Sequence, residues 1–118
     1  MSHDVCHFEI PAPDMAEAKR FYETVFGWKV ELWGDGCYAM VTTGEGALGG
    51  GFDGTEKPVE GGCVLIIECE DIPAMLAKIA VNGGVSVTEK TAIADGQMGY
   101  YCYFKDSLGN KLGLWSKT

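Results

Sequence analysis

The most informative part of the sequence is Lys105-Asp106-Ser107-Leu108-Gly109-Asn110-Lys111-Leu112-Gly113-Leu114-Trp115, close to the end of the chain. It reads as a tight turn followed by a short strand of alternating character. Because side chains alternate across a strand, Leu112 and Leu114 are expected on the core face, and Gly113 and Trp115 on the opposite face. The aromatic run before the turn predicts another strand over 100–104.

Working outward from this stretch, the chain contains two helical segments with the same pattern. Asp14 and Asp71 are expected N-caps, and the glycines that end the two helices are Gly27 and Gly84. Both pairs are separated by 57 residues, which indicates an internal repeat. Each helix has one expected strand before it and three after it. The strands are expected at 5–10, 28–32, 38–42 and 48–52, and at 63–70, 85–90, 100–104 and 111–116.

Size and composition agree with a compact soluble protein. The 118 residues, 47% of them hydrophobic, suffice for one domain with its own core. The net charge of −8 argues against nucleic-acid binding. The chain has no apolar run of membrane-spanning length and no secretory leader pattern, so the expected location is the cytoplasm. Four of the five cysteines lie in apolar strand-like runs, which favours reduced core residues over disulfides.

Three motifs, at 7–14, 21–28 and 106–110, together resemble the glyoxalase, bleomycin-resistance and extradiol-dioxygenase superfamily, the vicinal oxygen chelate proteins. The resemblance implies an α+β fold of two βαβββ modules, which form curved mixed sheets around a cleft. Module 1 would cover about 1–53 and module 2 about 62–118, with a polar linker at 54–61, all within a single domain. The resemblance also implies a homodimer, the usual closed assembly of a small domain.

In metal-dependent members of this superfamily, the first and last strands of each module supply four ligands. His7 matches the first of these positions, but its repeat equivalent is Val64 and the last-strand position is Gly113. The corresponding strand of the first unit, 47–51, offers no donor side chain. Since a divalent ion needs several converging donors, no cofactor is expected and a divalent metal is disfavoured.

The residues expected to line the cleft are His7, Glu9, Tyr101, Tyr103, Gly113 and Trp115. His7 and Glu9 share a strand face and are candidates for acid or base catalysis. Each also has a purely structural interpretation, as a bonded strand histidine and as a salt-linked carboxylate. Tyr101 and Tyr103 would offer hydroxyls to a ligand, and Gly113 beside Trp115 would leave room for a flat molecule. Cys6 and Cys102 lie on expected core faces and are poor candidates for nucleophiles.

Three functions are compatible with this pattern. The first, which the missing ligands favour, is a binding protein for a small apolar or aromatic molecule that lacks the usual metal site. The second is a metal-dependent lyase or isomerase related to lactoylglutathione lyase, with a metal site rebuilt from other residues. The third is a non-catalytic accessory or regulatory dimer.

Overall fold

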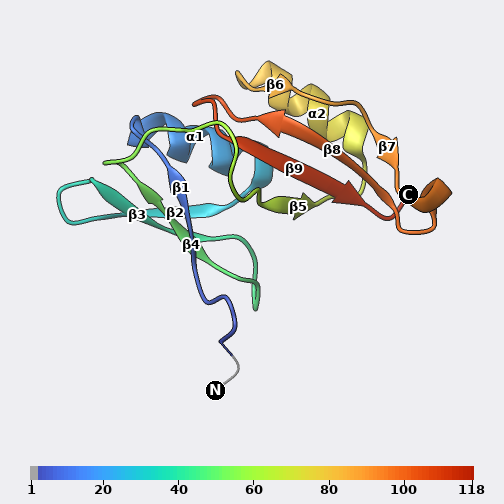
Figure 1. The fold of residues 1–118 in the computed structure, drawn as a ribbon. Helices are drawn as coiled ribbons and strands as arrows, with labels where there is room; N and C mark the ends of the chain where they lie inside the picture. The colour runs from blue at the N-terminus through green and yellow to red at the C-terminus, as the bar shows by residue number, and fades with distance from the viewer. Residues whose placement is uncertain (1–2) are drawn as a thin grey trace. The chain divides into compact units, whose positions relative to one another are not determined.

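The computed structural model describes residues 3–118. The chain divides into two compact units, the first ending at Pro58 and the second beginning at Val59 (Figure 1). Each unit contains one long helix and one mixed sheet, and the repeated β-α-β-β-β order runs through both. The predicted α+β class with two βαβββ modules is therefore confirmed.

The first unit follows the predicted order closely. Its elements are β1 (Phe8–Pro11), α1 (Met15–Phe26), β2 (Lys29–Trp33), β3 (Tyr38–Thr42) and β4 (Gly50–Asp53). The sheet order is β1-β4-β3-β2, in which β1 and β4 run parallel and the other neighbours antiparallel. The first and last strands of the unit consequently lie side by side.

The second unit repeats this topology with additions. Its elements are β5 (Ile66–Glu68), α2 (Ile72–Val81), β6 (Val85–Ser86), β7 (Thr91–Ala92), the 3-10 turn η1 (Ala94–Gly96), β8 (Tyr100–Lys105) and β9 (Lys111–Ser116). The order is β5-β9-β8-β6, with β7 also paired to β8. Again the first and last strands, β5 and β9, are parallel neighbours.

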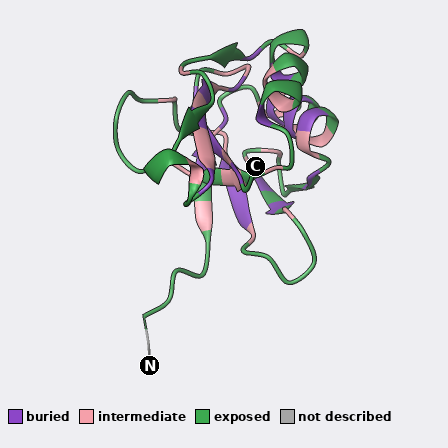
Figure 2. Cartoon of the chain, turned by 90° about the vertical axis from the view of Figure 1, so that its right-hand side faces the viewer, coloured by how far each residue is buried: buried purple, intermediate pink, exposed green. Residues whose placement is uncertain are grey.

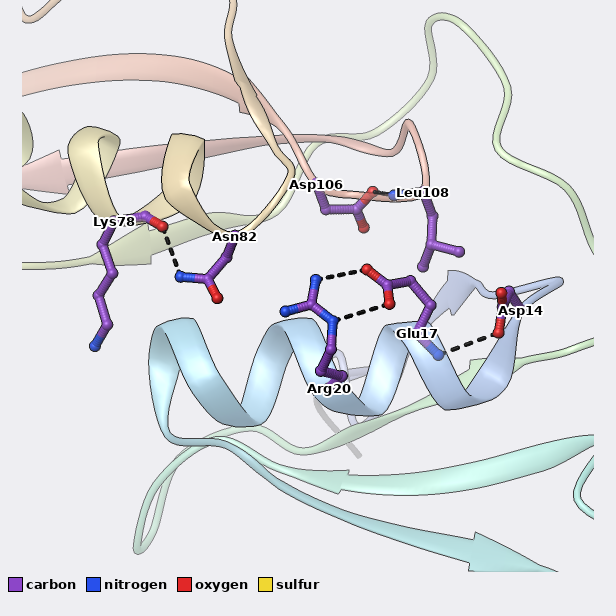
Figure 3. Close-up of polar contacts among 7 residues, drawn as sticks. All are labelled: Asp14, Glu17, Arg20, Lys78, Asn82, Asp106 and Leu108. Atoms are coloured by element: carbon purple, nitrogen blue, oxygen red, sulfur yellow. Dashed lines mark hydrogen bonds and ion pairs between the residues drawn. The ribbon is translucent and has the colours of Figure 1, made fainter.

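The N-caps predicted for both helices are present, and so is the glycine predicted to end α1. The prediction that Gly84 ends the second helix is wrong, because α2 ends at Val81 with Asn82 as its C-cap. A carboxylate oxygen of Asp14 accepts a hydrogen bond from the Glu17 backbone N–H at 3.1 Å (Figure 3). Asp71 accepts one from the Ala74 N–H at 3.0 Å in the same way. Gly27 ends α1 with a φ of 70°, a left-handed conformation that glycine adopts without steric cost. These caps satisfy N–H groups that a helix start leaves unpaired.

Each sheet packs one face into a core. In the first unit the buried side chains from α1 include Phe21, Tyr22 and Val25, and the Tyr22 ring stacks on Trp28 at 4.8 Å between centroids. In the second unit, α2 contacts β8 and β9, and the buried set is Ile72, Ile79, Cys102, Phe104, Leu112 and Leu114. The purple segments in Figure 2 trace this buried material. The apolar alternation read from the sequence is thus the core face of each sheet.

A turn held by one aspartate joins β8 to β9. The buried Asp106 carboxylate accepts hydrogen bonds from the Leu108 N–H at 2.9 Å (Figure 3) and from the Asn110 N–H at 2.8 Å. The Asn110 side-chain amide donates to its second oxygen at 3.0 Å. Gly109 supplies the left-handed step with a φ of 99°. The turn between β8 and β9 is therefore stabilised by its own side chains.

Some sequence predictions are wrong in detail. The segment 63–70 forms only the short β5, the strand expected at 85–90 is limited to β6, and β7 and η1 were missed. Of the five cysteines, all free, only Cys102 is buried, while Cys6, Cys37 and Cys63 are exposed. Cys6 is exposed because β1 begins two residues later, so no sheet pairing holds it in the predicted core face. No helix in residues 3–118 is long and apolar enough to cross a membrane.

Candidate functional site

The solvent-facing side of the first sheet carries a chain of three polar side chains. His7 lies immediately before β1, Glu9 lies within it, and Tyr38 begins β3. The His7 Nε2 atom is 2.7 Å from the Tyr38 hydroxyl oxygen, and that hydroxyl donates to a Glu9 carboxylate oxygen at 3.0 Å. His7 and Glu9 are exposed, and Tyr38 is half-buried between them. Tyr38 therefore links the two candidate catalytic residues.

The bonding pattern assigns a direction to these hydrogen bonds. A tyrosine hydroxyl carries one proton, and Tyr38 donates it to Glu9. His7 Nε2 must then donate to the Tyr38 oxygen, which leaves His7 Nδ1 as the nitrogen available to another group. Burial and the neighbouring Glu9 carboxylate both raise the pKa of the Tyr38 phenol. Tyr38 thus stays protonated at neutral pH and acts as a bridge rather than a base.

A glycine beneath Tyr38 makes this arrangement sterically feasible. Gly51 of β4 lies directly opposite Glu9 of β1 in the parallel pair. A Cβ atom at Gly51 would collide with the hydroxyl and ring of Tyr38. Next to Tyr38, Trp33 is its partner in the antiparallel β2–β3 pair and is 62% exposed. The open face therefore combines a polar group with an exposed aromatic side chain.

The second sheet has an aromatic open face. Tyr101, Tyr103, Gly113 and Trp115 share this face, and the intervening Cys102, Phe104, Leu112 and Leu114 are buried. The Tyr101 and Tyr103 rings meet edge to face, with centroids 5.6 Å apart. Among the candidate site residues, these four lie together in the second unit, whereas His7 and Glu9 lie together in the first.

The space expected above Gly113 is occupied by a neighbouring side chain. A Cβ atom at Gly113 would lie 2.5 Å from Ile66 Cδ1 and 3.3 Å from Tyr103 Cδ1. The Trp115 indole is also engaged, since its N–H donates to the Met98 carbonyl oxygen at 2.9 Å. The expectation that Gly113 leaves room for a flat ligand is therefore corrected: Ile66 fills that room. The partly exposed surfaces of Tyr101, Tyr103 and Trp115 remain available.

The two units are equivalent at these glycines. Gly51 lies opposite Glu9, and Gly113 lies opposite Ile66, which follows Glu9 by the 57 residues of the repeat. In both units a neighbouring side chain covers the glycine, Tyr38 in the first and Ile66 in the second. In residues 3–118 no group of three or more His, Cys, Asp or Glu side chains converges. Gly51 and Gly113 carry no donor atom, so these two positions supply no side-chain ligand of a four-ligand metal site.

Sequence reasoning missed Tyr38. The sequence does contain the pattern that places Tyr38 on the open face: along β3, Tyr38, Met40 and Thr42 alternate with the buried Ala39 and Val41. That alternation places Tyr38 on the open face, but its hydrogen bonds to β1 depend on strand β4 lying between β1 and β3. Cys102 is confirmed as a poor nucleophile, since burial raises the pKa of its thiol.

Sequence comparisons relate the chain to known proteins. Residues 5–44 match the family described as bleomycin resistance protein-like N-terminal. A "Glyoxylase-like domain-containing protein" from Didymella fabae is 26% identical over 109 residues, which cover 86% of this chain and 84% of the relative.

Structural comparisons show that the fold is shared over nearly the whole chain. A glyoxalase/bleomycin resistance protein/dioxygenase family enzyme from Burkholderia phytofirmans PsJN superposes with a TM-score of 0.79 at 13% identity, over 98% of this chain and 99% of that one. Lactoylglutathione lyase from Agrobacterium tumefaciens superposes with a TM-score of 0.70 at 15% identity, over 97% and 93%. The doubled fold, the family match over residues 5–44 and these relatives agree: the chain has the fold of the glyoxalase, bleomycin-resistance and dioxygenase proteins, the vicinal oxygen chelate superfamily, and is similar in sequence to a glyoxylase-like protein.

Proposed function

We propose that this chain is a glyoxalase-like protein that binds a small apolar or aromatic molecule without the metal site usual in its superfamily. The observation that carries the proposal is the pair of covered glycines, Gly51 and Gly113. They stand where each unit would need a last-strand ligand, and the side chains over them are a phenol and an alkyl group. What remains on the open faces is aromatic surface with a few hydrogen-bonding groups, the usual lining of a small-molecule site.

The candidate residues form one group in each unit under this proposal. In the second unit, Tyr101, Tyr103 and Trp115 would offer aromatic surface to an apolar group, with Gly113 as the backbone beneath them. In the first unit, His7 would offer its Nδ1 atom to a polar group, and Glu9 would position Tyr38, which in turn positions His7. Acid or base catalysis by His7 and Glu9 belongs to the same proposal, since the imidazole is exposed and oriented.

We further propose that the two units form one domain and that the protein acts in the cytoplasm as a homodimer. The continuous match of nearly the whole chain to single superfamily structures supports the one-domain assignment. The closed two-fold symmetry usual for small soluble domains supports the dimer.

The alternative function is a metal-dependent lyase related to lactoylglutathione lyase. The observation in its favour is that His7, just before β1, and Glu9, within β1, are both exposed and belong to one hydrogen-bonded group. A metal site here would require at least one more ligand. His7 could coordinate through Nε2 only if Tyr38 released that atom, and otherwise only through Nδ1.

Elemental analysis combined with ligand titration tests the two functions against each other. We expect the dialysed protein to contain no stoichiometric divalent metal and to bind aromatic probes, with perturbed amide resonances at Tyr101 and Tyr103. About one Zn, Ni, Mn or Fe per chain that is lost in His7→Ala would overturn the binding proposal in favour of the lyase. A Lys57→Ala variant, in the linker, serves as the control for nonspecific metal loss.

A further inference from the structure

Two lysines face each other at one end of the aromatic face of the second sheet. Lys105 ends β8 and Lys111 begins β9, and the two are direct partners in the antiparallel pair. Residues opposed in this way have Cβ atoms about 5 Å apart, and like charges there destabilise a sheet. The chain carries only nine Lys and Arg against seventeen Asp and Glu. A like-charged cationic pair in such an acidic protein requires an explanation.

Both lysines lie on the open face. Lys105 alternates with the buried Phe104 and shares its side of β8 with Tyr103. The Lys111 ammonium lies over the Tyr103 ring, with Nζ 4.5 Å from the centroid. Within residues 3–118, neither ammonium has a carboxylate partner within 4.0 Å. The positive charge at this end of the face is therefore not neutralised by an ion pair within the described chain.

Aromatic and apolar surface continues from the lysines along the strands. The next row of cross-strand neighbours on this face consists of Tyr103, Gly113 and Ile66, and the row after it contains Tyr101 and Trp115. Ile66 is 50% exposed, and Val85, the β6 partner of Lys105, is 60% exposed. The acidic Glu68 lies on the same face only at the level of Trp115, four residues or roughly 13 Å along the strand from Lys111. The face is thus cationic at one end and apolar in the middle.

We propose that this face binds a small aromatic carboxylate, with the carboxylate between Lys105 and Lys111 and the ring against Tyr101 and Tyr103. The inference rests on the proposed small-molecule function and specifies its ligand class. Two ammonium groups suit the two oxygens of one carboxylate, and binding relieves their mutual repulsion. A singly charged ligand suits a protein of net charge −8 better than a dianion, because the overall field repels each negative charge.

The test compares two probes that differ in charge. The full chain, labelled with 15N, is titrated with 2-naphthoate and with the neutral 2-naphthalenemethanol at low ionic strength. We expect naphthoate to bind about three- to tenfold more tightly, with amide shifts at Tyr103, Gly113 and Lys111. In about 0.5 M NaCl this advantage should fall toward one, while binding of the alcohol stays unchanged or strengthens slightly.

Matched variants separate the lysine pair from general charge effects. Lys105→Met with Lys111→Met keeps the apolar stems and removes both charges, and we expect naphthoate to bind only as well as the alcohol. Lys78→Met, on the exposed surface of α2, removes one charge elsewhere and should leave both affinities unchanged. Circular dichroism and thermal unfolding show whether the variants keep the fold.

The outcomes distinguish this inference from the proposed function. If both probes bind equally well to the wild-type chain, the lysine pair is no carboxylate site, while small-molecule binding stands. If naphthoate is preferred but the shifts are at Tyr38 and Gly51, the site lies on the other sheet and the inference is wrong. If neither probe binds, the inference and the proposed function both fail.

Discussion

At the scale of single residues, Tyr38 is the side chain that organises the first open face. It bridges His7 and Glu9, and it covers Gly51. Its hydroxyl donates to a carboxylate, so ionising Tyr38 would break that bond and place two negative charges side by side. The stability of the folded protein should therefore depend on pH in the range where Tyr38 ionises.

We predict that Tyr38 titrates above the usual range of a tyrosine, since burial first and Glu9 second raise its pKa. A folded-state pKa above the unfolded value means that Tyr38 contributes stability below about pH 10, which is lost as pH rises through its folded pKa. The Cζ resonance of Tyr38, followed by NMR against pH, measures this. Glu9→Gln should lower the Tyr38 pKa only partly, because burial remains. A complete return to the ordinary tyrosine value would show that Glu9, and not burial, dominates.

The contact between Ile66 and Gly113 makes a second prediction at this scale. Gly113→Ala should destabilise the fold by about 1 kcal/mol, because the new methyl group overlaps Ile66 Cδ1, the end of a half-exposed side chain that must turn aside. In an Ile66→Val background, which lacks Cδ1, the same change should cost clearly less. Urea unfolding of the wild type, the two single variants and the double variant gives the coupling energy between positions 66 and 113. Additive effects within about 0.3 kcal/mol would mean that Ile66 does not cover Gly113.

At the scale of elements, the β8–β9 turn depends on one buried carboxylate. Asp106 accepts three hydrogen bonds within five residues, and such closure of a turn by its own side chains orders the two strands that carry the aromatic face. The register that pairs Lys105 with Lys111, and Tyr103 with Gly113, is set by this turn.

We predict that Asp106→Ala destabilises the protein by about 2–4 kcal/mol, because it leaves the part-buried N–H of Leu108 and the buried N–H of Asn110 without an acceptor. Asp106→Asn should cost less, since one side-chain oxygen is retained. Thermal or urea unfolding measures both changes. Asp35→Ala is the matched control: its carboxylate also accepts from a backbone N–H two residues on, that of Cys37, but at an exposed turn. An Asp106→Ala variant as stable as Asp35→Ala would show that the turn needs no side-chain support.

At the scale of the whole molecule, the prediction concerns assembly. We expect a homodimer of about 25 kDa, twice the 12.7 kDa chain, because closed two-fold association is the usual state of small soluble domains. Light scattering across micromolar concentrations checks the mass. A mass that stays at one chain up to several hundred micromolar would exclude the dimer.

Sequence patterns alone predicted the order of elements that the two units share, without β7 and η1, and the core faces of β8 and β9. Asp14, Asp71 and Gly27 mark helix ends through local backbone chemistry, and alternation along β8 and β9 separates buried from open positions. Such signals act over a few residues, so they can be read without the fold. The resemblance to the superfamily further implied that Val64 and Gly113 stand where other members have metal ligands.

The contacts between side chains of distant strands follow from the tertiary structure and not from local patterns. Tyr38 joins His7 and Glu9 because β4 brings β1 and β3 into one sheet, and that pairing order is absent from any local pattern. Ile66 covers Gly113 because β5 and β9 are parallel neighbours although 47 residues separate these two positions. The exposure of Cys6 likewise depends on where sheet pairing begins, not on hydrophobicity. Contacts between distant strands are set by the packing of the whole unit, which is why the sequence indicated the face of each residue but not its partner.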